Sequence, residues 1–281
     1  MTMNKAKLSG NIRQAILIIF LSTSCFIALL PFFWTFSTSL RLPSESYRMP
    51  PSFFPTDFHY QHYITVFTTF PFLRFIINSL FVSFSVLILC LITTTMAAFS
   101  FARINFRFKN VIFILFMSGL MIPFYATMIS VYIIMSKLRL VGTHWALIIP
   151  GAISPLHIFL IRQFMMTIPK SYEEAAEIEG CGRFTIYSKI MIPMSKPVMM
   201  IAGLQVFIAS WNNFVAPLIY LSKWESMTLP IGIRLLAGYM GTGSMSVVLA
   251  GIAMSLVMPI LLFSFGQRYL IEGIALSGVK S

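Results

Sequence analysis

Half of the acidic residues in this 281-residue chain lie in one short segment. The chain has eight Asp and Glu residues, and four of them fall within seven positions of the segment SYEEAAEIEGCGRFTIYSKIMIP (171–193), namely Glu173, Glu174, Glu177 and Glu179. Clustered carboxylates can pair with basic side chains in a cleft of a partner protein. The segment is therefore the first candidate functional site.

Other residues that could do chemistry show no pattern typical of a catalytic or metal site. The apolar runs hold neither paired carboxylates nor a Ser/His/Asp set, and Cys25, Cys90 and Cys181 lack the spacing of a zinc site or disulfide framework. The four histidines are scattered. The stretch GYMGTGS (238–244) lacks the Gly-Lys-Ser/Thr ending of a phosphate loop, and no Walker A sequence occurs elsewhere. We expect no catalytic residue, no metal and no cofactor bound by this chain.

The composition predicts a protein that faces lipid. The chain is 58% hydrophobic and 10% charged, whereas soluble domains carry about 25% charged residues. The net charge of +12 could suggest a nucleic-acid partner. The basic residues, however, lie in short clusters between long apolar runs, which is typical of membrane topology. We therefore exclude nucleic acid and expect membrane lipid around the chain.

Six apolar runs are long enough to cross a bilayer, which takes about 20 residues. They cover 14–38, 73–101, 110–135, 144–167, 197–221 and 245–267. The first run follows basic residues but is too long for a signal peptide, so we interpret it as a retained span. Prolines in these runs predict kinked helices. The expected fold class is an all-α membrane protein with six transmembrane helices.

The distribution of Lys and Arg predicts the orientation. With the N-terminus in the cytoplasm, thirteen basic residues fall in inside segments and seven in outside segments. The expected organisation is a cytoplasmic N-terminus (1–13), a six-helix transmembrane domain (14–270) and a cytoplasmic tail (271–281). Loops 39–72 and 222–244 are then extracytoplasmic, and the segment 169–196 is a cytoplasmic loop.

The acidic segment is predicted to form two short helices at an angle. Ser171 followed by Glu174 three residues later is typical of a capping box at a helix start. Gly180 and Gly182 then break the helix, a second helix fits 183–191, and Pro193 is expected to end it. One interpretation is an amphipathic hairpin on the membrane surface. Such a helix on an anionic leaflet should be basic, so docking into a basic cleft of a partner is favoured.

The segment resembles the EAA loop of permease subunits in ABC importers. That pattern is Glu-Ala-Ala, three residues, Gly, nine residues, then Ile-x-Leu-Pro. This chain has Glu174-Ala175-Ala176, Gly180 and Ile190-Met191-Ile192-Pro193, with Ile in place of Leu. The family often has Asp before the Gly and Ala after it, where this chain has Glu179 and Cys181. The whole pattern is specific, although EAA alone is not.

The resemblance extends over almost the full length. INSLFVSFSV (77–86), SWNNFVAPLIYL (210–221), LPIGI (229–233) and the end QRYLIEGIALSGVKS resemble the carbohydrate branch, and the end resembles the tail of the maltose-type inner subunit. The resemblance implies the type I ABC importer permease fold in a bacterial inner membrane. It implies a second permease subunit, two ATPase subunits that bind ATP and Mg, an extracytoplasmic solute-binding protein and a sugar or oligosaccharide substrate.

The resemblance also implies roles for individual residues. Glu174 would meet a basic residue of the ATPase, Ala175 and Ala176 would allow close approach, and Gly180 would permit the turn. Tyr172 and Ile178 would pack in the ATPase cleft or, alternatively, against the spans of this chain. Glu173 is expected to face water. The tail would reach between the ATPase subunits with Gly278, Val279, Lys280 and Ser281.

Polar residues within the fifth run are candidates for the translocation pathway. Polar side chains in a span are costly unless they bond another helix or face water, and amides and aromatic faces suit sugar hydroxyls. The candidates are Gln205, Trp211, Asn212 and Asn213. An equal alternative is that they bond helices of the partner permease.

Three other functions are alternatives to the sugar importer. One is an ABC permease for a non-sugar solute. A second is an ion-coupled secondary transporter, which usually places acids within its spans. The stretches 75–102, 110–136 and 197–222 hold no charge, which disfavours it. A membrane-embedded enzyme is disfavoured by the lack of catalytic sets in the spans.

Overall fold

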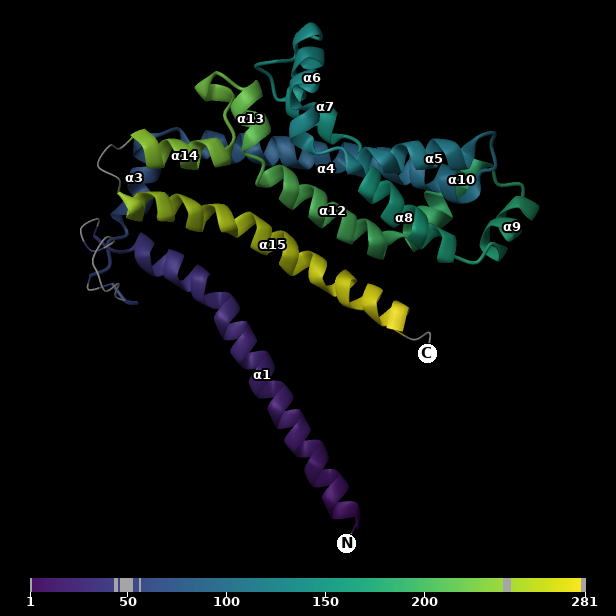
Figure 1. Ribbon diagram of the computed structural model, residues 1–281, viewed down its shortest axis with the longest axis horizontal. Helices are drawn as coiled ribbons and strands as arrows, with labels where there is room; N and C mark the ends of the chain where they lie inside the picture. The colour runs from purple at the N-terminus through teal and green to yellow at the C-terminus, as the bar shows by residue number, and fades with distance from the viewer. Residues whose placement is uncertain (1, 43–44, 46–52, 56, 240–243, 279–281) are drawn as a thin grey trace. The chain divides into compact units, whose positions relative to one another are not determined.

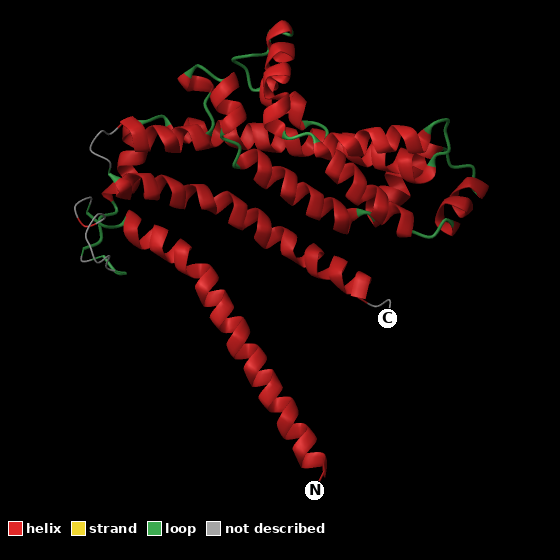
Figure 2. Cartoon of the chain, in the orientation of Figure 1, coloured by secondary structure: helices red, strands yellow, loops and turns green. Residues whose placement is uncertain are grey.

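The computed structural model describes the chain except for residues 1, 43–44, 46–52, 56, 240–243 and 279–281. Every regular element within the described residues is a helix, as the composition predicts (Figure 2). The chain forms two compact units. One comprises Met1–Phe70 with Leu235–Leu256, and the other comprises Pro71–Arg234 with Val257–Ser281.

Four helical stretches of the described residues are long and apolar enough to cross a membrane. They are Arg13–Ser39, Phe72–Arg103, Trp145–Thr167 and Met245–Arg268. They belong to α1 (Thr2–Ser39), α4 (Phe72–Arg103), α7 with α8 (Trp145–Gly151 and Pro155–Thr167) and α15 (Met245–Gly278). Two bent helix pairs raise the number to six if each pair counts as one span.

The bend in the predicted run 110–135 agrees with the kinked helices that the prolines predict. The predicted run 110–135 is α5 (Lys109–Ser118), η1 (Gly119–Met121) and α6 (Phe124–Lys137), with a bend of 106°. Pro123, extended at ψ 143°, starts α6 and has no N–H to continue the preceding helix. The second bent pair is Arg183–Met194 with Lys196–Trp211, bent by 78°. The predicted run 197–221 is α12 (Lys196–Trp211) and α13 (Val215–Tyr220), separated at 212–214.

In the first unit, α1 is an apolar helix with little packing of its own. None of the residues in its most apolar 18-residue stretch is buried. At its end, the Ser39 hydroxyl lies 2.8 Å from the Tyr63 hydroxyl of α3 (Gln61–Thr69). Buried Arg41 lies over the Trp34 ring and donates to Ser37 Oγ at 3.0 Å. The predicted loop 39–72 therefore contains a short helix and an ordered junction with α1.

In the second unit, α4 is the central helix. It packs against α7, α8 and α12, whose ribbons lie beside it in Figure 1. Its sequence has no Gly or Pro, and its threonines bond within the helix: Thr95 Oγ1 donates to Leu91 O at 2.6 Å. Such bonding satisfies hydroxyls where water is absent. The result is an unbroken helix of 32 residues, against which several other helices pack.

Two clusters of buried side chains lie along α4. The first surrounds Val82, Val86 and Cys90, with partners from α6, α7, α12 and α13. The second surrounds Ala98 and Phe99 and gathers α8, α12 and the acidic segment. This second cluster is the structural base on which the candidate site is built.

The predicted extracytoplasmic loop 222–244 is largely structured. It contains η3 (Trp224–Ser226) and the apolar α14 (Leu229–Tyr239). The Asn78 amide donates to the carbonyls of Glu225 and Met227, both at 2.9 Å. A Cβ on Gly232 would lie 2.2 Å from the Phe75 ring of α4, so the start of α14 approaches α4 closely.

Candidate functional site: the acidic segment and the polar cavity

The acidic segment begins with a helix that lacks the predicted capping box. Helix α9 runs from Ser171 to Ile178, at the end of α8 (Figure 1). Lys170 is its N-cap and has helical angles, with no capping side chain. Ser171 is therefore already inside the helix, where its hydroxyl cannot take the N-cap position. The amides of Glu173 and Glu174 instead bond to the carbonyl of Lys170.

Gly180 ends α9 in a Schellman motif. Its φ is +79°, in the left-handed region that glycine adopts without strain. The amide of Cys181 donates to Ala176 O at 2.9 Å, and the amide of Gly180 donates to Glu177 O at 3.0 Å. These are the two bonds that define the motif. The predicted break at Gly180 is confirmed. Gly182, by contrast, has an ordinary φ of −73°.

The second short helix is longer than predicted. It consists of α10 (Arg183–Ile186), a π-helical turn (Tyr187–Met191) and α11 (Ile192–Met194). The expectation that Pro193 ends the helix is wrong. Pro193 lies in the first turn of α11, where a missing N–H costs little. The chain bends by 78° only after it, into α12.

The second helix is anchored to α4. The Tyr187 hydroxyl lies 2.8 Å from Thr95 Oγ1, and the Tyr187 ring packs 5.4 Å from that of Phe99. Ile186 and Met191 are fully buried in the second core cluster. The segment is therefore fixed to the helical bundle on one side.

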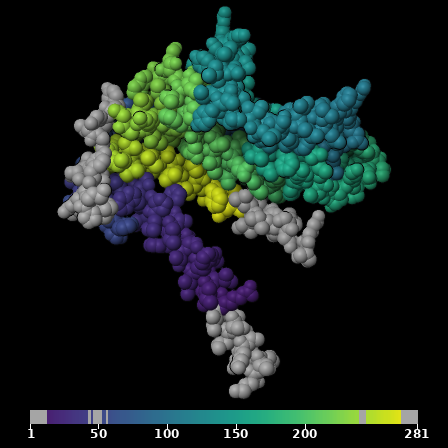
Figure 3. All heavy atoms as spheres, viewed as in Figure 1, coloured from purple at the N-terminus to yellow at the C-terminus, as the bar shows by residue number. Residues whose placement is uncertain are grey.

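The opposite side of α9 is exposed. Tyr172 is 51% exposed and Ile178 is 88% exposed, so neither packs against the spans of this chain. Glu174 and Ala175 are exposed as well. Residues 171–178 lie at the surface of the second unit in the space-filling view (Figure 3). An exposed apolar residue beside carboxylates is suited to contact with another protein.

Two expectations for α9 are corrected. Ala176 is 7% exposed and packs in the second core cluster, so it faces this chain and not a partner. Glu173 does not face water. It is 7% exposed, and its Oε1 lies 2.8 Å from Nε of Arg103. Residues 173 and 176 are three apart and share the inner face of the helix.

Sequence reasoning did not find Arg103, Thr95 or Tyr187 as parts of this site. Arg103 was counted only as a charge at the end of a span. Its partner Glu173 is 70 residues away, and no local pattern connects them. Thr95 and Tyr187 are 92 residues apart, which is farther still. The sequence held one indication that Glu173 is buried. Glu173 and Ala176 are three residues apart, so they lie on the same face of the helix.

Three of the four residues predicted to contact the ATPase from the tail lie outside the described residues. Gly278 is the last residue of α15, and Val279, Lys280 and Ser281 lie beyond the described part. The predicted tail therefore begins as a continuation of the last helix.

The pathway candidates lie in different environments. Trp211 is 4% exposed and stacks on Phe207 at 5.7 Å, so its ring face packs within this chain. Gln205 and Asn212 are exposed, and Asn213 is half-buried. Asn213 Oδ1 accepts a bond from the Ala216 amide at 3.2 Å, which places it at the start of α13.

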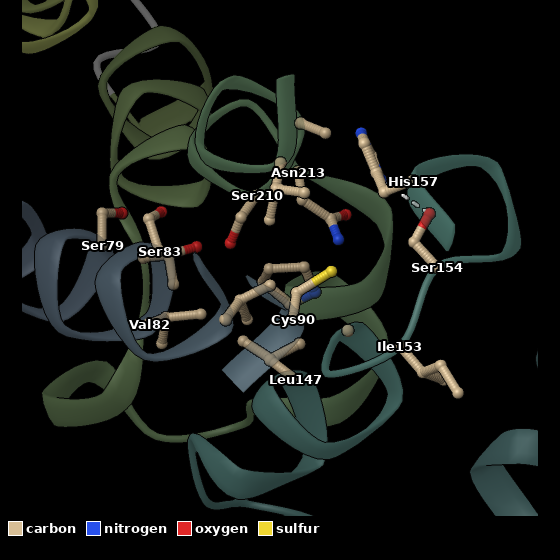
Figure 4. A pocket seen from close by; sticks show the side chains of 16 residues that line it. Ser79, Val82, Ser83, Cys90, Leu147, Ile153, Ser154, His157, Ser210 and Asn213 are labelled. Atoms are coloured by element: carbon tan, nitrogen blue, oxygen red, sulfur yellow. Dashed lines mark hydrogen bonds between the residues drawn. The ribbon is translucent and has the colours of Figure 1, made fainter. Parts of the chain in front are cut away.

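Asn213 lines a cavity of about 250 Å³ between α4, the junction of α7 and α8, and the end of α12. Its other polar lining residues were not predicted: they are Ser79, Ser83, Ser154, His157, Ser210 and Thr228. Ser210 and Asn213 point towards α4 in the close-up (Figure 4). His157 Nδ1 lies 2.8 Å from Ser154 Oγ. A cavity of this size with hydroxyl and amide groups can hold several ordered waters or a small polar solute.

The described residues contain no cluster of His, Cys, Asp or Glu that could hold a metal ion. The site therefore offers a docking face and a polar cavity. The cavity brings the Ser154 hydroxyl and the His157 ring within 2.8 Å of each other, but no carboxylate lines it. Binding is the chemistry that the docking face and the cavity can both perform.

These features define a helical membrane protein with a rigid surface segment built for contact with another protein. Residues 91–274 match the family of binding-protein-dependent transport system inner membrane components. The chain belongs to this family, so the predicted resemblance to permease subunits of ABC importers is confirmed.

Several known proteins are similar to this chain. It is 36% identical over 203 residues to the arabinooligosaccharides transport system permease protein of Halalkalibacterium halodurans, covering 72% of each chain. It is 30% identical to the protein of that description in Bacillus subtilis, over 74% of this chain and 73% of the other. The fold resembles a chain of a bacterial ABC transporter involved in import of the acidic polysaccharide alginate. The TM-score is 0.82 at 23% identity, covering 93% of this chain and 98% of the other.

Proposed function

We propose that this chain is one of two permease subunits in an importer that carries a sugar or oligosaccharide into the cell. The observation that carries the proposal is the acidic segment, whose outer face is exposed while its inner face is fixed to α4. The named substrates of the similar proteins, arabinooligosaccharides and alginate, support a carbohydrate.

The proposed partners are a second permease, two ATPase subunits that hold ATP and Mg, and an extracytoplasmic binding protein. The apolar and unburied α1 needs lipid or a second permease around it, because its exposed side chains would otherwise face water. The absence of a Walker A sequence in this chain means that another subunit must supply ATP hydrolysis by that route.

The ATPase is proposed to dock on the outer face of α9. Tyr172, Glu174, Ala175 and Ile178 form this face, and Gly180 sets the turn that follows it. A carboxylate flanked by exposed apolar side chains fits a cleft with a basic residue. The two neighbouring carboxylates therefore have different roles. Glu173 pairs with Arg103 within this chain, and Glu174 is exposed and available to the partner.

Both termini are proposed to be cytoplasmic, in a bacterial inner membrane. The thirteen-to-seven distribution of basic residues supports this orientation. It places α9 on the side where ATP is available. The segment 222–244 with α14 is then on the outside, where the binding protein would dock.

Asn213, with Gln205 and Asn212, is the proposed polar contribution of this chain to the pathway. Asn213 faces the polar cavity, which supports contact with a hydrated solute. The alternative, that Gln205 and Asn212 bond the partner permease, is supported by their exposure. Asn213→Ala should weaken transport with intact assembly, and loss of assembly would favour the alternative.

An ion-coupled transporter is not favoured. All eight acidic residues lie outside the candidate spans, including both bent pairs. Proton or sodium coupling usually requires an acid within a span. A non-sugar solute is still an alternative within the ABC class.

The test is transport by the purified complex. The tagged chain is purified with its co-expressed partners, placed in liposomes with ATP inside, and supplied outside with the binding protein and labelled arabinooligosaccharides or alginate oligosaccharides. ATP-dependent accumulation of a sugar is expected. Accumulation driven by an ion gradient without ATP would contradict the proposal.

A further inference from the structure

A buried ion pair connects the acidic segment to the rest of the helical bundle. Arg103 is the last residue of α4, and Glu173 is in the first turn of α9. Their side chains are only 4% and 9% exposed, and Nε of Arg103 lies 2.8 Å from Oε1 of Glu173. Few charged side chains are buried to this extent unless they are paired.

Arg103 also binds the end of a third helix. Its Nη2 donates to Met165 O at 2.6 Å and to Ile168 O at 2.5 Å. These carbonyls are at the C-terminal end of α8, where the helix dipole favours a positive charge. One guanidinium therefore joins α4, α8 and α9. The planar, multiple-donor geometry of Arg makes such a three-way contact possible.

The same segment holds a second ion pair with the opposite character. Arg183 Nη1 lies 2.7 Å from Glu177 Oε1, and the two side chains are 57% and 44% exposed. Exposed pairs contribute little because water screens them. The two pairs have nearly equal distances and differ in burial, so the second serves as a matched control.

A further contact joins the segment to α4 at another point. Tyr187 and Thr95 meet through their hydroxyls, and Thr95 is eight residues before Arg103, about 12 Å along the helix. The two short helices of the segment are thus bound to α4 at separate places. Two separated contacts resist rotation as well as translation of the segment.

We propose that the Arg103–Glu173 pair couples α9 to the transmembrane helices, so that a displacement of α9 moves α4 and α8 with it. Arg103 and Glu173 are positioning residues that transmit the movement and do not contact the ATPase. The inference rests on the proposed docking of an ATPase at α9. Two neighbouring carboxylates then have different roles: Glu173 transmits the movement to α4 and α8, and Glu174 binds the ATPase.

The test measures sugar transported per ATP hydrolysed in the purified complex. The variants are Glu173→Gln, Arg103→Gln and their combination, with Glu177→Gln as the control. The two Glu→Gln changes keep the shape of the side chain, whereas Arg103→Gln also removes the bonds to Met165 O and Ile168 O. None of these variants changes Tyr172, Glu174, Ala175 or Ile178. ATPase recovery on the tagged chain is measured in parallel, because a purely structural role would lower assembly and transport together.

Glu173→Gln should retain the ATPase subunits but lower transport per ATP by about tenfold, within the usual range of coupling between sites. The double variant should be no worse than Arg103→Gln alone, because both changes remove one interaction. Glu177→Gln should match the unaltered complex. Normal transport per ATP in Glu173→Gln, or an equal loss in Glu177→Gln, would overturn the inference. Failure of the unaltered chain to recover any ATPase would instead overturn the proposed function.

Discussion

At the scale of single residues, neighbouring carboxylates have opposite environments. Glu173 and Glu174 are adjacent in sequence, yet one is buried against Arg103 and the other is exposed. A helix turns by about 100° per residue, so the side chains of Glu173 and Glu174 leave the helix in different directions. The inner carboxylate stabilises this chain, and the outer one is available to a partner.

Glu173→Ala is predicted to lower the stability of the chain. Removal of one partner from a buried ion pair costs about 3–5 kcal/mol, because the other charge stays buried. Thermal unfolding in detergent, followed by the loss of monodisperse protein, measures the effect. Glu177→Ala breaks the exposed pair and should cost about 0–1 kcal/mol. Equal melting temperatures for the two variants would show that the buried pair contributes nothing.

At the scale of elements, the turn after α9 depends on one backbone conformation. Gly180 has a φ of +79°, and a Cβ there would meet no atom within 4 Å. The cost of substitution is thus conformational and not steric. A left-handed residue with a Cβ costs roughly 1–2 kcal/mol, more when the side chain is bulky or β-branched.

Gly180→Leu is predicted to weaken recovery of the ATPase, because the Schellman motif would open and α9 would shift. Gly182→Ala is the matched control, since Gly182 also has open space around it but a φ of −73°. Co-purification of ATPase with each variant measures the outcome. A Gly180→Leu complex with full ATPase recovery and normal transport would contradict the assigned role of the turn.

The sequence allowed the helical class, the apolar runs and the two-helix form of the acidic segment to be predicted, because each depends on local patterns. It predicted a kink in the run 110–135 from its proline, but neither the 106° size of the bend nor the buried side of α9. The bend at Pro123 depends on whether neighbours tolerate a broken helix. The burial of Glu173 and Ala176 depends on α4 and α8, which are distant in sequence. The polar cavity was missed because its hydroxyls come from several helices, and of its polar lining only Asn213 was predicted.

At the scale of the whole molecule, the orientation in the membrane decides which face meets which partner. The bias of basic residues predicts that Pro55 is outside and Glu177 is inside. Single cysteines at these positions, in a background without the native cysteines, test it. An impermeant thiol reagent added to intact cells should label Pro55→Cys and not Glu177→Cys. The reverse pattern would contradict the orientation.

The docking of an ATPase on the outer face of α9 is the central claim, and Glu174 tests it most directly. Loss of one partner from a charged pair at an interface costs about 2–5 kcal/mol, which is well over a tenfold loss of affinity. Glu225→Ala, at the distant η3, is the control. The measurement is the amount of ATPase recovered per tagged chain. We predict that Glu174→Ala recovers at least about tenfold less ATPase while Glu225→Ala matches the unaltered chain. Equal recovery from all three would contradict the account.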